Sequence, residues 1–221
     1  MGRFFVIGDI HGCYKTLQKL LFEELKIKKV DRILFLGDYI DRGPDSKKVI
    51  KLIMKLEEEG YEIDKLIGNH ELMLLEAIDS PFQYHHWLKY GGKETLQSFK
   101  ILHPSKLKNK YLAFLKNLSY FKIFKEYIFV HGGLNFKIEN PLDDLKSMPW
   151  IRNSEIISEK IGNRTIVVGH TPSTLDQIKE SLKSKRILLD GGCVYKSRKD
   201  FGNLVALELN SMKLYFVYNI D

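Results

Sequence analysis

Residues that can bind metal ions follow short apolar runs at five places along the chain. Each run ends in a glycine or directly in a residue of this kind. The residues are Asp9 and His11, Asp38, Asn69, His131 and His170. They offer oxygen and nitrogen but no thiolate, so the set suits Mn²⁺, Fe or Zn²⁺ better than a structural cysteine-zinc site. We therefore expect a metal centre where the fold brings them together.

One carboxylate in this set can serve two cations. Asp9 and His11 lie two residues apart in an extended segment and can face one ion, while Asp38 has two oxygens with which to bridge to a second. The other three residues would complete the second site. Two divalent ions roughly 3.5–4 Å apart can share a water, lower its pKa and assist an in-line displacement at phosphorus. The pattern indicates a dinuclear hydrolytic centre.

Four further residues could take part in donating protons or hydrogen bonds to a substrate, which metal ions cannot do. His70 directly follows Asn69 and would protonate the leaving oxygen, while Asp41 would accept its other N–H, fix its tautomer and raise its pKa. Arg42 and Arg152 would bind phosphoryl oxygens, because a planar guanidinium matches phosphate in a bidentate way. The expected mechanism is acid catalysis with charge stabilisation and no covalent intermediate.

The apolar runs themselves predict buried β-strands. They are short, flanked by glycine and rich in Val, Ile and Phe, which favours strands over helices. They read Phe4-Phe5-Val6-Ile7, Ile33-Leu34-Phe35-Leu36, Leu66-Ile67, Ile128-Phe129-Val130 and Ile166-Val167-Val168. In an open α/β sheet the carboxyl ends of the strands border the ligand-binding crevice, so the polar side chains would gather there.

Helical spacing follows the first two runs. The apolar positions are Leu17, Leu20, Leu21 and Leu25 after the first, and Val49, Ile50, Ile53, Met54 and Leu56 after the second. Strand, polar loop and helix therefore alternate twice. This order predicts an α/β fold.

The rest of the chain changes character twice. Segment 71–117 has helical patterns broken by Pro81, Gly91-Gly92 and Pro104, and we expect a helical insertion over one side of the sheet. The C-terminal third predicts strands at 187–189, 204–209 and 214–218, which we expect to form a second, largely antiparallel sheet packed on the first. With no linker or repeat in 221 residues, a single catalytic domain over 1–221 is the economical interpretation.

Bulk properties narrow the location and the partners. No stretch approaches the ~20 apolar residues of a membrane span, and two cysteines are too few for a disulfide framework, so a cytoplasmic protein is expected. The formal charge of +7 is spread over predicted helix faces, such as Lys47, Lys48, Lys51 and Lys55. A solvated lysine-rich face explains this better than dedicated binding of nucleic acid or membrane.

The sequence lacks the residues needed by two other classes of enzyme that act on phosphate groups. A cysteine phosphatase would need an arginine six residues after its nucleophile, but Cys13 is followed there by Lys19 and Cys193 by Lys199. No Gly-x-x-x-x-Gly-Lys-Ser/Thr loop occurs, which excludes a P-loop NTPase.

The motifs resemble those of a known family. Gly8-Asp9-Ile10-His11-Gly12, Gly37-Asp38-Tyr39-Ile40-Asp41-Arg42-Gly43, Gly68-Asn69-His70-Glu71 and His131-Gly132-Gly133 are similar to the signatures of the phosphoprotein phosphatase family of serine/threonine phosphatases, within the calcineurin-like metallophosphoesterases. Compact bacterial members and bacteriophage lambda phosphatase are the nearest likeness. The resemblance also includes His86-Trp87-Leu88, Trp150-Ile151-Arg152 and Gly169-His170-Thr171-Pro172, and so extends over essentially the whole chain.

This resemblance implies a four-layer fold of two mixed β-sheets flanked by helices, with a dinuclear centre often filled by manganese. It implies one ion on Asp9, His11 and Asp38, a second on Asp38, Asn69, His131 and His170, His70 as the acid with Asp41 behind it, and Arg42 and Arg152 as phosphate clamps. The chain departs from the family where Asp190-Gly191-Gly192 replaces the common Asp-Thr-Gly, and it lacks the longer C-terminal segments of eukaryotic members. Specificity for protein substrates therefore stays open.

The expected activity is metal-dependent hydrolysis of phosphoserine and phosphothreonine, with phosphotyrosine and small aryl esters as further substrates. The alternative is symmetrical hydrolysis of dinucleoside tetraphosphates, although such hydrolases typically carry a small residue and an aspartate where this chain has Asp41 and Glu71. A nuclease or cyclic-nucleotide phosphodiesterase and a metal-dependent binding module are the remaining readings. The two arginines favour a dianionic terminal phosphate over a diester.

Overall fold

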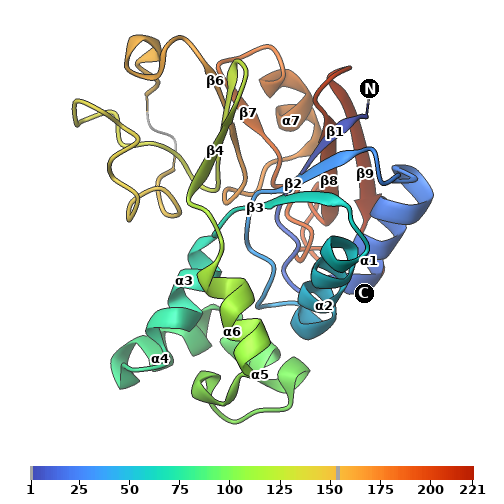
Figure 1. Ribbon diagram of the computed structural model, residues 1–221, viewed down its shortest axis with the longest axis vertical. Helices are drawn as coiled ribbons and strands as arrows, with labels where there is room; N and C mark the ends of the chain where they lie inside the picture. The colour runs from blue at the N-terminus through green and yellow to red at the C-terminus, as the bar shows by residue number, and fades with distance from the viewer. Residues whose placement is uncertain (1, 153–154) are drawn as a thin grey trace.

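Two mixed β-sheets lie against each other in the computed structural model, which describes residues 2–152 and 155–221 (Figure 1). The first sheet has the order β3-β2-β1-β8-β9 and the second β4-β5-β6-β7. The first contains β1 (Phe4–Ile7), β2 (Arg32–Phe35), β3 (Glu62–Lys65), β8 (Asn203–Glu208) and β9 (Lys213–Tyr218), and the second contains β4 (Phe121–Phe124), β5 (Tyr127–Val130), β6 (Thr165–Val168) and β7 (Arg186–Leu188). The predicted α/β fold with two mixed sheets flanked by helices is confirmed.

Strand β1 shows why its apolar run is continuous. Phe4 and Val6 face the second sheet, where they pack in one cluster with Phe129 and Val167. Side chains of odd number, such as Phe5, point the other way into the core beneath the helices. Because successive side chains alternate between faces and both faces are buried, every position of the strand is apolar.

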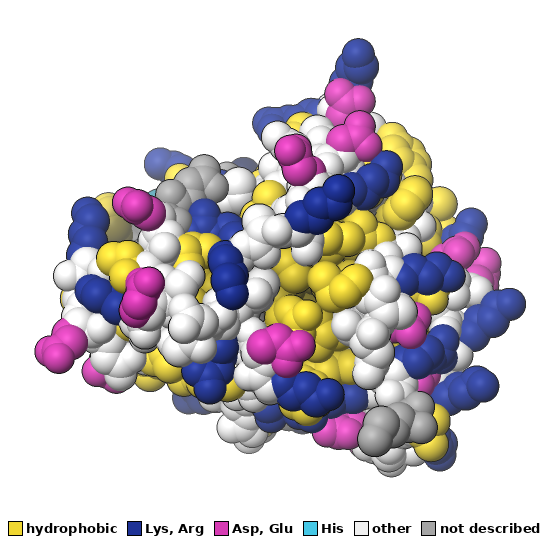
Figure 2. All heavy atoms as spheres, turned by 90° about the horizontal axis from the view of Figure 1, so that it is seen from above, with side chains coloured by type: hydrophobic (Ala, Val, Ile, Leu, Met, Phe, Trp, Pro, Cys, Tyr) yellow, Lys and Arg dark blue, Asp and Glu magenta, His cyan; other side chains and the backbone are white. Residues whose placement is uncertain are grey.

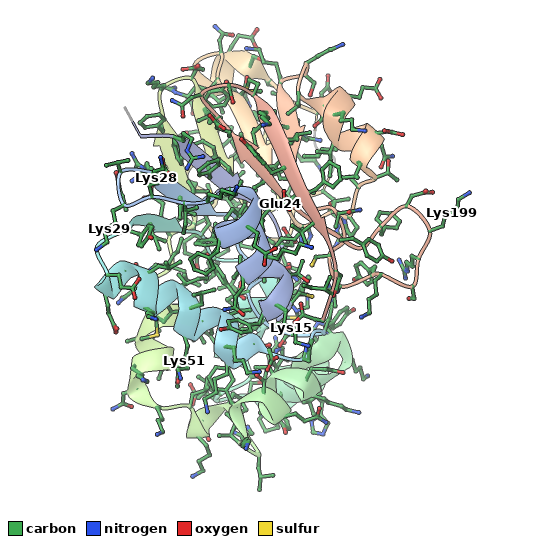
Figure 3. All side chains as sticks on the ribbon, turned by 90° about the vertical axis from the view of Figure 1, so that its right-hand side faces the viewer. Lys15, Glu24, Lys28, Lys29, Lys51 and Lys199 are labelled. Carbon is green, nitrogen blue, oxygen red and sulfur yellow. The ribbon has the colours of Figure 1, made fainter. Side chains whose placement is uncertain are left out.

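Helices cover the outer face of the first sheet. They are α1 (Tyr14–Lys19), which continues into a π-helical turn at Leu20–Glu24, and α2 (Ser46–Glu58). In α2 the apolar positions Val49, Ile50 and Ile53 are buried, while Lys51 is exposed and is seen on this face in Figure 3. The lysines expected on a solvated helix face lie there.

A group of short helices lies at the carboxyl ends of β1, β2 and β3. These are α3 (Asn69–Glu76), α4 (Pro81–Trp87), α5 (Lys93–Phe99) and α6 (Asn109–Lys116), with a π-helical turn at Leu88–Gly92 and a 3₁₀ turn at Pro104–Lys106. The group touches the loop after β2 at Gly91, whose carbonyl accepts the backbone N–H of Arg42 at 3.1 Å. Gly91 has φ +105°, and a Cβ there would lie 2.6 Å from the Arg42 nitrogen, so this close approach requires glycine.

The outer face of the second sheet is covered mainly by irregular chain. Leu134, Phe136 and Met148 pack against Ile128 and Ile166 of that sheet. A 3₁₀ turn at Ser158–Ile161 and helix α7 (Leu175–Ser181), which lies beside β7, complete the second half of the fold. No helix in the described part of the chain has the length and apolar character needed to cross a bilayer.

Two expectations about strands are wrong. The three C-terminal strands do not form a separate sheet, because β7 pairs with β6 in the second sheet while β8 pairs antiparallel with β1 in the first. Strand β8 is buried on both faces, which suits a position in the middle of a sheet. In addition, Leu66-Ile67 follows strand β3 instead of forming it, because the third strand lies at the sheet edge and is made of the more polar residues 62–65.

A carboxylate from the far end of the chain caps helix α1. The helix has no side-chain cap of its own at Cys13. Instead, Asp221 accepts the backbone N–H groups of Lys15 and Thr16, both at 3.0 Å, and the Thr16 hydroxyl at 2.7 Å. A carboxylate at this position satisfies unpaired N–H groups and interacts favourably with the helix dipole.

We predict that Asp221→Ala lowers the free energy of unfolding by about 1 kcal/mol, the usual cost of losing an N-terminal cap. Denaturant unfolding followed by circular dichroism would measure it. Asp79→Ala is the matched control, since Asp79 is an exposed carboxylate and its loss should change stability by less than about 0.5 kcal/mol. Equal stability of the Asp221 variant and the wild type would contradict the capping role.

Candidate metal centre and active site

The loops that carry the candidate residues turn sharply as they leave their strands. His11, Asp38, Asp41, Arg42 and His170 all have positive φ, between 46° and 71°. This left-handed conformation is sterically unfavourable for residues with a Cβ and tends to cluster at functional sites. This backbone strain is compatible with a fold that holds the side chains of these five residues in fixed orientations.

Asp38 lies at the middle of the candidate site. It is 2% exposed, with one oxygen 3.4 Å from Nε2 of His11 and the other 3.4 Å from Nε2 of His131. Two buried sets of candidate ligand atoms share it, and the atoms of each set lie within 4.8 Å of one another. The sets are His11, Asp38 and His70, and Asp38, His131 and His170. This arrangement places Asp38 where a bridging carboxylate would have to be.

Backbone carbonyls orient two of the imidazoles. Nδ1 of His11 donates to the Ile40 carbonyl at 2.9 Å, and Nδ1 of His131 to the Leu36 carbonyl at 3.0 Å. With the proton on Nδ1, Nε2 carries the free lone pair and faces Asp38. This is how a protein commonly fixes the tautomer of a metal-binding histidine.

Asn69 joins the two histidines of the second set. Its side-chain oxygen lies 2.8 Å from Nδ1 of His170 and 3.2 Å from Nε2 of His131. The three predicted ligands that come from three separate loops therefore meet at one point. Together with Asp38 they supply two oxygens and two nitrogens, a donor set that fits a divalent cation.

Burial controls the charge of these histidines. It lowers the pKa of His11 well below its usual value and that of His170 to about 3. Burial also acts to lower the pKa of His131, but the charge and hydrogen bond of Asp38, the charge of Glu71 and the hydrogen bond to Leu36 together outweigh it and the pKa is raised. Neutral imidazole is the form that binds metal, so two of the three are ready for a cation.

Asp9 is turned toward the loop after β6. Both of its oxygens lie near the backbone N–H of His170, at 2.9 and 3.1 Å. A Cβ on Gly169 would lie 2.1 Å from one of them, so only glycine allows this contact. Burial and the charge of Asp190 raise the pKa of Asp9 well above its usual value. Asp9 therefore lies next to the second set of ligand atoms, but neither set includes it, and its role as a ligand stays a prediction.

His70 and Asp41 form a buried pair. Nδ1 of His70 lies 2.7 Å from Oδ2 of Asp41, as expected from the sequence. The expectation that the pKa of His70 is raised is wrong, because burial lowers it to about 4. The indole N–H of Trp87 at 2.8 Å and the hydroxyl of Thr95 at 2.6 Å also donate to Asp41. These donors favour the carboxylate form, while burial raises the pKa of Asp41.

The two arginines occupy different positions. Arg42 lies at the centre, where Nη1 is 2.7 Å from Nε2 of His11. Arg152 is exposed and lies close enough to His170 for its charge to help lower the pKa of that histidine. Both cations therefore border the two sets of candidate metal ligands.

Glu71 is a structural residue whose role the sequence did not reveal. Its carboxylate is fully buried and accepts the backbone N–H groups of Gly68, Asp38 and Tyr39 at 2.9, 3.0 and 2.9 Å, and that of Ile40 at 3.3 Å. It thus joins the loop after β2 to the loop after β3. The sequence motif identified Glu71 only as a residue typical of the family. The position of Glu71 in the motif gives no sign that its carboxylate accepts four backbone N–H groups.

Comparison with known proteins agrees with this geometry. The family model described as calcineurin-like phosphoesterase matches residues 2–215. Serine/threonine-protein phosphatase 2 of Escherichia coli strain K12 is 41% identical over 87 residues, which cover 39% of this chain and 37% of that protein. The chain therefore matches well under half of the length of that relative.

Two further matches extend over most of the chain. PrpE of Oceanobacillus iheyensis, named an asymmetrical bis(5′-nucleosyl)-tetraphosphatase, is 28% identical over 223 residues, covering 87% of this chain and 85% of that protein. A crystal structure described as a putative diadenosine tetraphosphatase superimposes with a TM-score of 0.71 at 22% identity, covering 100% of this chain and 95% of the other. The structural match shows a shared fold.

We predict that Glu71→Gln lowers the free energy of unfolding by about 2 kcal/mol and weakens Mn²⁺ binding at least several-fold. The amide group of glutamine would direct N–H donors at backbone N–H groups and leave two of these without an acceptor. Denaturant unfolding and calorimetric Mn²⁺ titration would measure the two effects. Glu76→Gln, at an exposed position of the same helix, is the control. Normal Mn²⁺ affinity in a folded Glu71 variant would show that the loops do not need this carboxylate.

Proposed function

Because the chain belongs to the calcineurin-like phosphoesterase family, we propose that it is a metal-dependent phosphoprotein phosphatase that hydrolyses phosphoserine and phosphothreonine monoesters. The observation that carries the proposal is the pair of buried ligand sets that share Asp38, together with the hydrogen bond from His70, a member of the first set, to Asp41. Phosphotyrosine and small aryl phosphates are further proposed substrates. A cytoplasmic location is part of the same proposal.

The proposed cofactor is a pair of divalent ions, manganese first, with iron or zinc as alternatives. We assign Asp9, His11 and Asp38 to one ion and Asp38, Asn69, His131 and His170 to the other. When bound, such ions supply Lewis acidity that activates water and neutralises charge on the phosphoryl group. The buried donors, with their proton-bearing nitrogens already paired to backbone carbonyls, fit this cofactor.

The side chains beside the ligands supply the rest of the chemistry. His70 holds its Nδ1 proton against Asp41, which leaves Nε2 to exchange a proton with the leaving oxygen. In the free protein its pKa of about 4 keeps it neutral at pH 7. A dianionic phosphate nearby would raise that pKa, because negative charge favours the imidazolium. Protonation of His70 is therefore coupled to substrate binding.

The arginines are proposed to bind the phosphoryl oxygens. Arg42 already lies at His11, and Arg152 is near enough to His170 in the other set for its charge to act on that histidine. A guanidinium on each side would hold a terminal phosphate in a fixed orientation. Nucleic acid is not the proposed partner, and on the face shown in Figure 2 basic and acidic side chains are interspersed instead of forming one basic patch.

A second candidate function is hydrolysis of dinucleoside tetraphosphates. It is favoured by the two matches that cover most of the chain, one to PrpE and one to the structure described as a putative diadenosine tetraphosphatase. The named protein phosphatase relative matches over a shorter segment. Both activities use the same centre, so substrate preference separates them.

We predict that Mn²⁺-loaded protein hydrolyses p-nitrophenyl phosphate, that a chelator abolishes the activity, and that His70→Asn lowers kcat by ~10²–10⁴, the usual contribution of a general acid. His85→Asn is the control, because His85 is exposed and its described contacts are with the Pro81 carbonyl and the Tyr84 ring, away from the candidate ligands. Full turnover in the His70 variant would refute its assigned role, and activity in chelator would refute the metal requirement.

Side-by-side steady-state kinetics on a phosphoserine peptide and diadenosine tetraphosphate test the substrate class. We expect kcat/KM for the phosphopeptide to exceed that for the dinucleotide by at least about tenfold, which corresponds to ~1.4 kcal/mol of differential transition-state binding. A preference of that size for the dinucleotide would replace the first proposal with the second. A cyclic dinucleotide and a bis-aryl phosphate diester serve as controls for diesterase activity.

A further inference from the structure

A loop with several internal hydrogen bonds connects the candidate site to a basic part of the surface. It runs from Asp190 to Gly202, and backbone hydrogen bonds close it into successive turns. Tyr195 donates to Gly192 at 2.8 Å, Arg198 to Tyr195 at 2.9 Å, and Gly202 to Gly192 at 3.1 Å. The Tyr218 hydroxyl also donates to the Lys196 carbonyl at 2.8 Å. The position of Tyr195 is therefore fixed by the backbone around it.

The ring of Tyr195 is in contact with two guanidinium groups. Arg42 has its guanidinium carbon 5.4 Å from the ring centroid, and Arg198 has its own at 4.8 Å. Contacts of this kind are favourable and hold the flat guanidinium group against the ring. Since Arg42 also touches His11, a continuous row of side chains leads from the metal ligands to Arg198.

The outer end of this row carries the less compensated charge, because the buried carboxylates Asp9, Asp41 and Asp190 act on Arg42 and not on Arg198. In the described part of the chain, neither Arg42 nor Arg198 forms an ion pair with a carboxylate, whereas Arg3 pairs with Asp31 at 2.6 Å and Arg32 with Asp64 at 2.7 Å. Two neighbouring cations on one ring repel each other unless an anion lies near both. Such a site attracts a negatively charged group.

We propose that Tyr195 and Arg198, together with Arg42, form a second anion subsite, which binds an anionic group of the substrate next to the phosphoryl group that is hydrolysed. The inference rests on the proposed function, because it places the reacting phosphoryl group between Arg42 and the metal ligands. Two sources share this chemistry: the next phosphate of a polyphosphate chain, and an acidic side chain beside a phosphorylated residue. Arg198 is then a residue that determines specificity, and Tyr195 positions both guanidinium groups.

The central experiment compares Arg198→Ala with Lys199→Ala. The two variants lose the same charge from the same loop, but Lys199 projects from its tip (Figure 3) and has no contact with the Tyr195 ring among the described residues. We expect Arg198→Ala to raise KM roughly 5- to 10-fold for substrates with a second anionic group, as for loss of one charge-assisted contact that is partly exposed. KM for p-nitrophenyl phosphate, which has no such group, should stay unchanged in both variants.

The substrates identify the source of the anion. A KM increase for diadenosine tetraphosphate alone assigns the subsite to the polyphosphate chain. An increase for a phosphoserine peptide with a neighbouring aspartate, but not for the same peptide with alanine there, assigns it to an acidic side chain. An equal increase for every substrate, an equal effect of Lys199→Ala, or no effect of Arg198→Ala on any anionic substrate would overturn the proposal.

Binding provides a readout that does not need turnover. Calorimetric titration of the Mn²⁺-loaded protein with inorganic pyrophosphate and with inorganic phosphate should show that Arg198→Ala weakens pyrophosphate binding several-fold and leaves phosphate binding unchanged. Tyr195→Leu should weaken pyrophosphate binding as Arg198→Ala does and should also weaken phosphate binding, because the ring positions Arg42 as well, whereas Tyr195→Phe, which keeps the ring, should bind both anions as the wild type does. If the protein hydrolyses neither monoesters nor tetraphosphates, the proposed function fails, and pyrophosphate binding still decides whether the anion subsite exists.

Discussion

Five carboxylates are buried together at the centre of this protein, and the rest of the site is arranged around the cost of burying them. They are Asp9, Asp38, Asp41, Glu71 and Asp190, each 3% exposed or less. Removing a carboxylate from water is unfavourable unless hydrogen bonds or opposite charges compensate. Glu71 receives backbone N–H groups, Asp41 receives an indole and a hydroxyl, and Asp38 has a histidine at each oxygen. Burial nevertheless raises the pKa of Glu71 to about 8 and that of Asp190 to about 6. The raised pKa values mean that this buried centre disfavours carboxylate charge that nothing compensates, and a bound cation would supply that compensation in place of a proton.

The fold meets the same constraint through its backbone. The five candidate residues with positive φ lie in the loops that follow the strands, and glycines in these loops permit contacts that any side chain would block. Gly68 illustrates the point, because a Cβ there would lie 2.1 Å from the carboxylate oxygen of Asp38. The short apolar strands β1, β2, β5 and β6 behind these loops are buried along most of their length and support the loops. Strain at the site is thus supported by packing elsewhere in the sheets.

The sequence predicts the part of the structure that local patterns determine. Short apolar runs ending in glycine and a polar residue located four of the strands, and the motif residues Asp38, Asn69, His131 and His170 do lie together. The features that the sequence did not predict depend on contacts between residues that are far apart in the chain. Strand β8 joins β1 across some 200 residues of chain, and no periodicity within β8 shows which sheet it enters. The contacts of Asp41 with Trp87 and Thr95 also join residues that are distant in the sequence, so no local pattern predicts them. The effect of burial on the pKa of His70 likewise depends on the surrounding fold.

Arg42 shows how these elements act together. Nε2 of His11 has one lone pair, because its Nδ1 proton is held by Ile40, and in this structure that lone pair accepts a hydrogen bond from Arg42. A cation coordinated by His11 needs the same lone pair, so Arg42 has to leave His11 when the centre is loaded. Its backbone is held in place by Gly91, and the Tyr195 ring already lies beneath its guanidinium group. The N–H groups freed in this way would be available to the phosphoryl group of a substrate, as the proposed function requires.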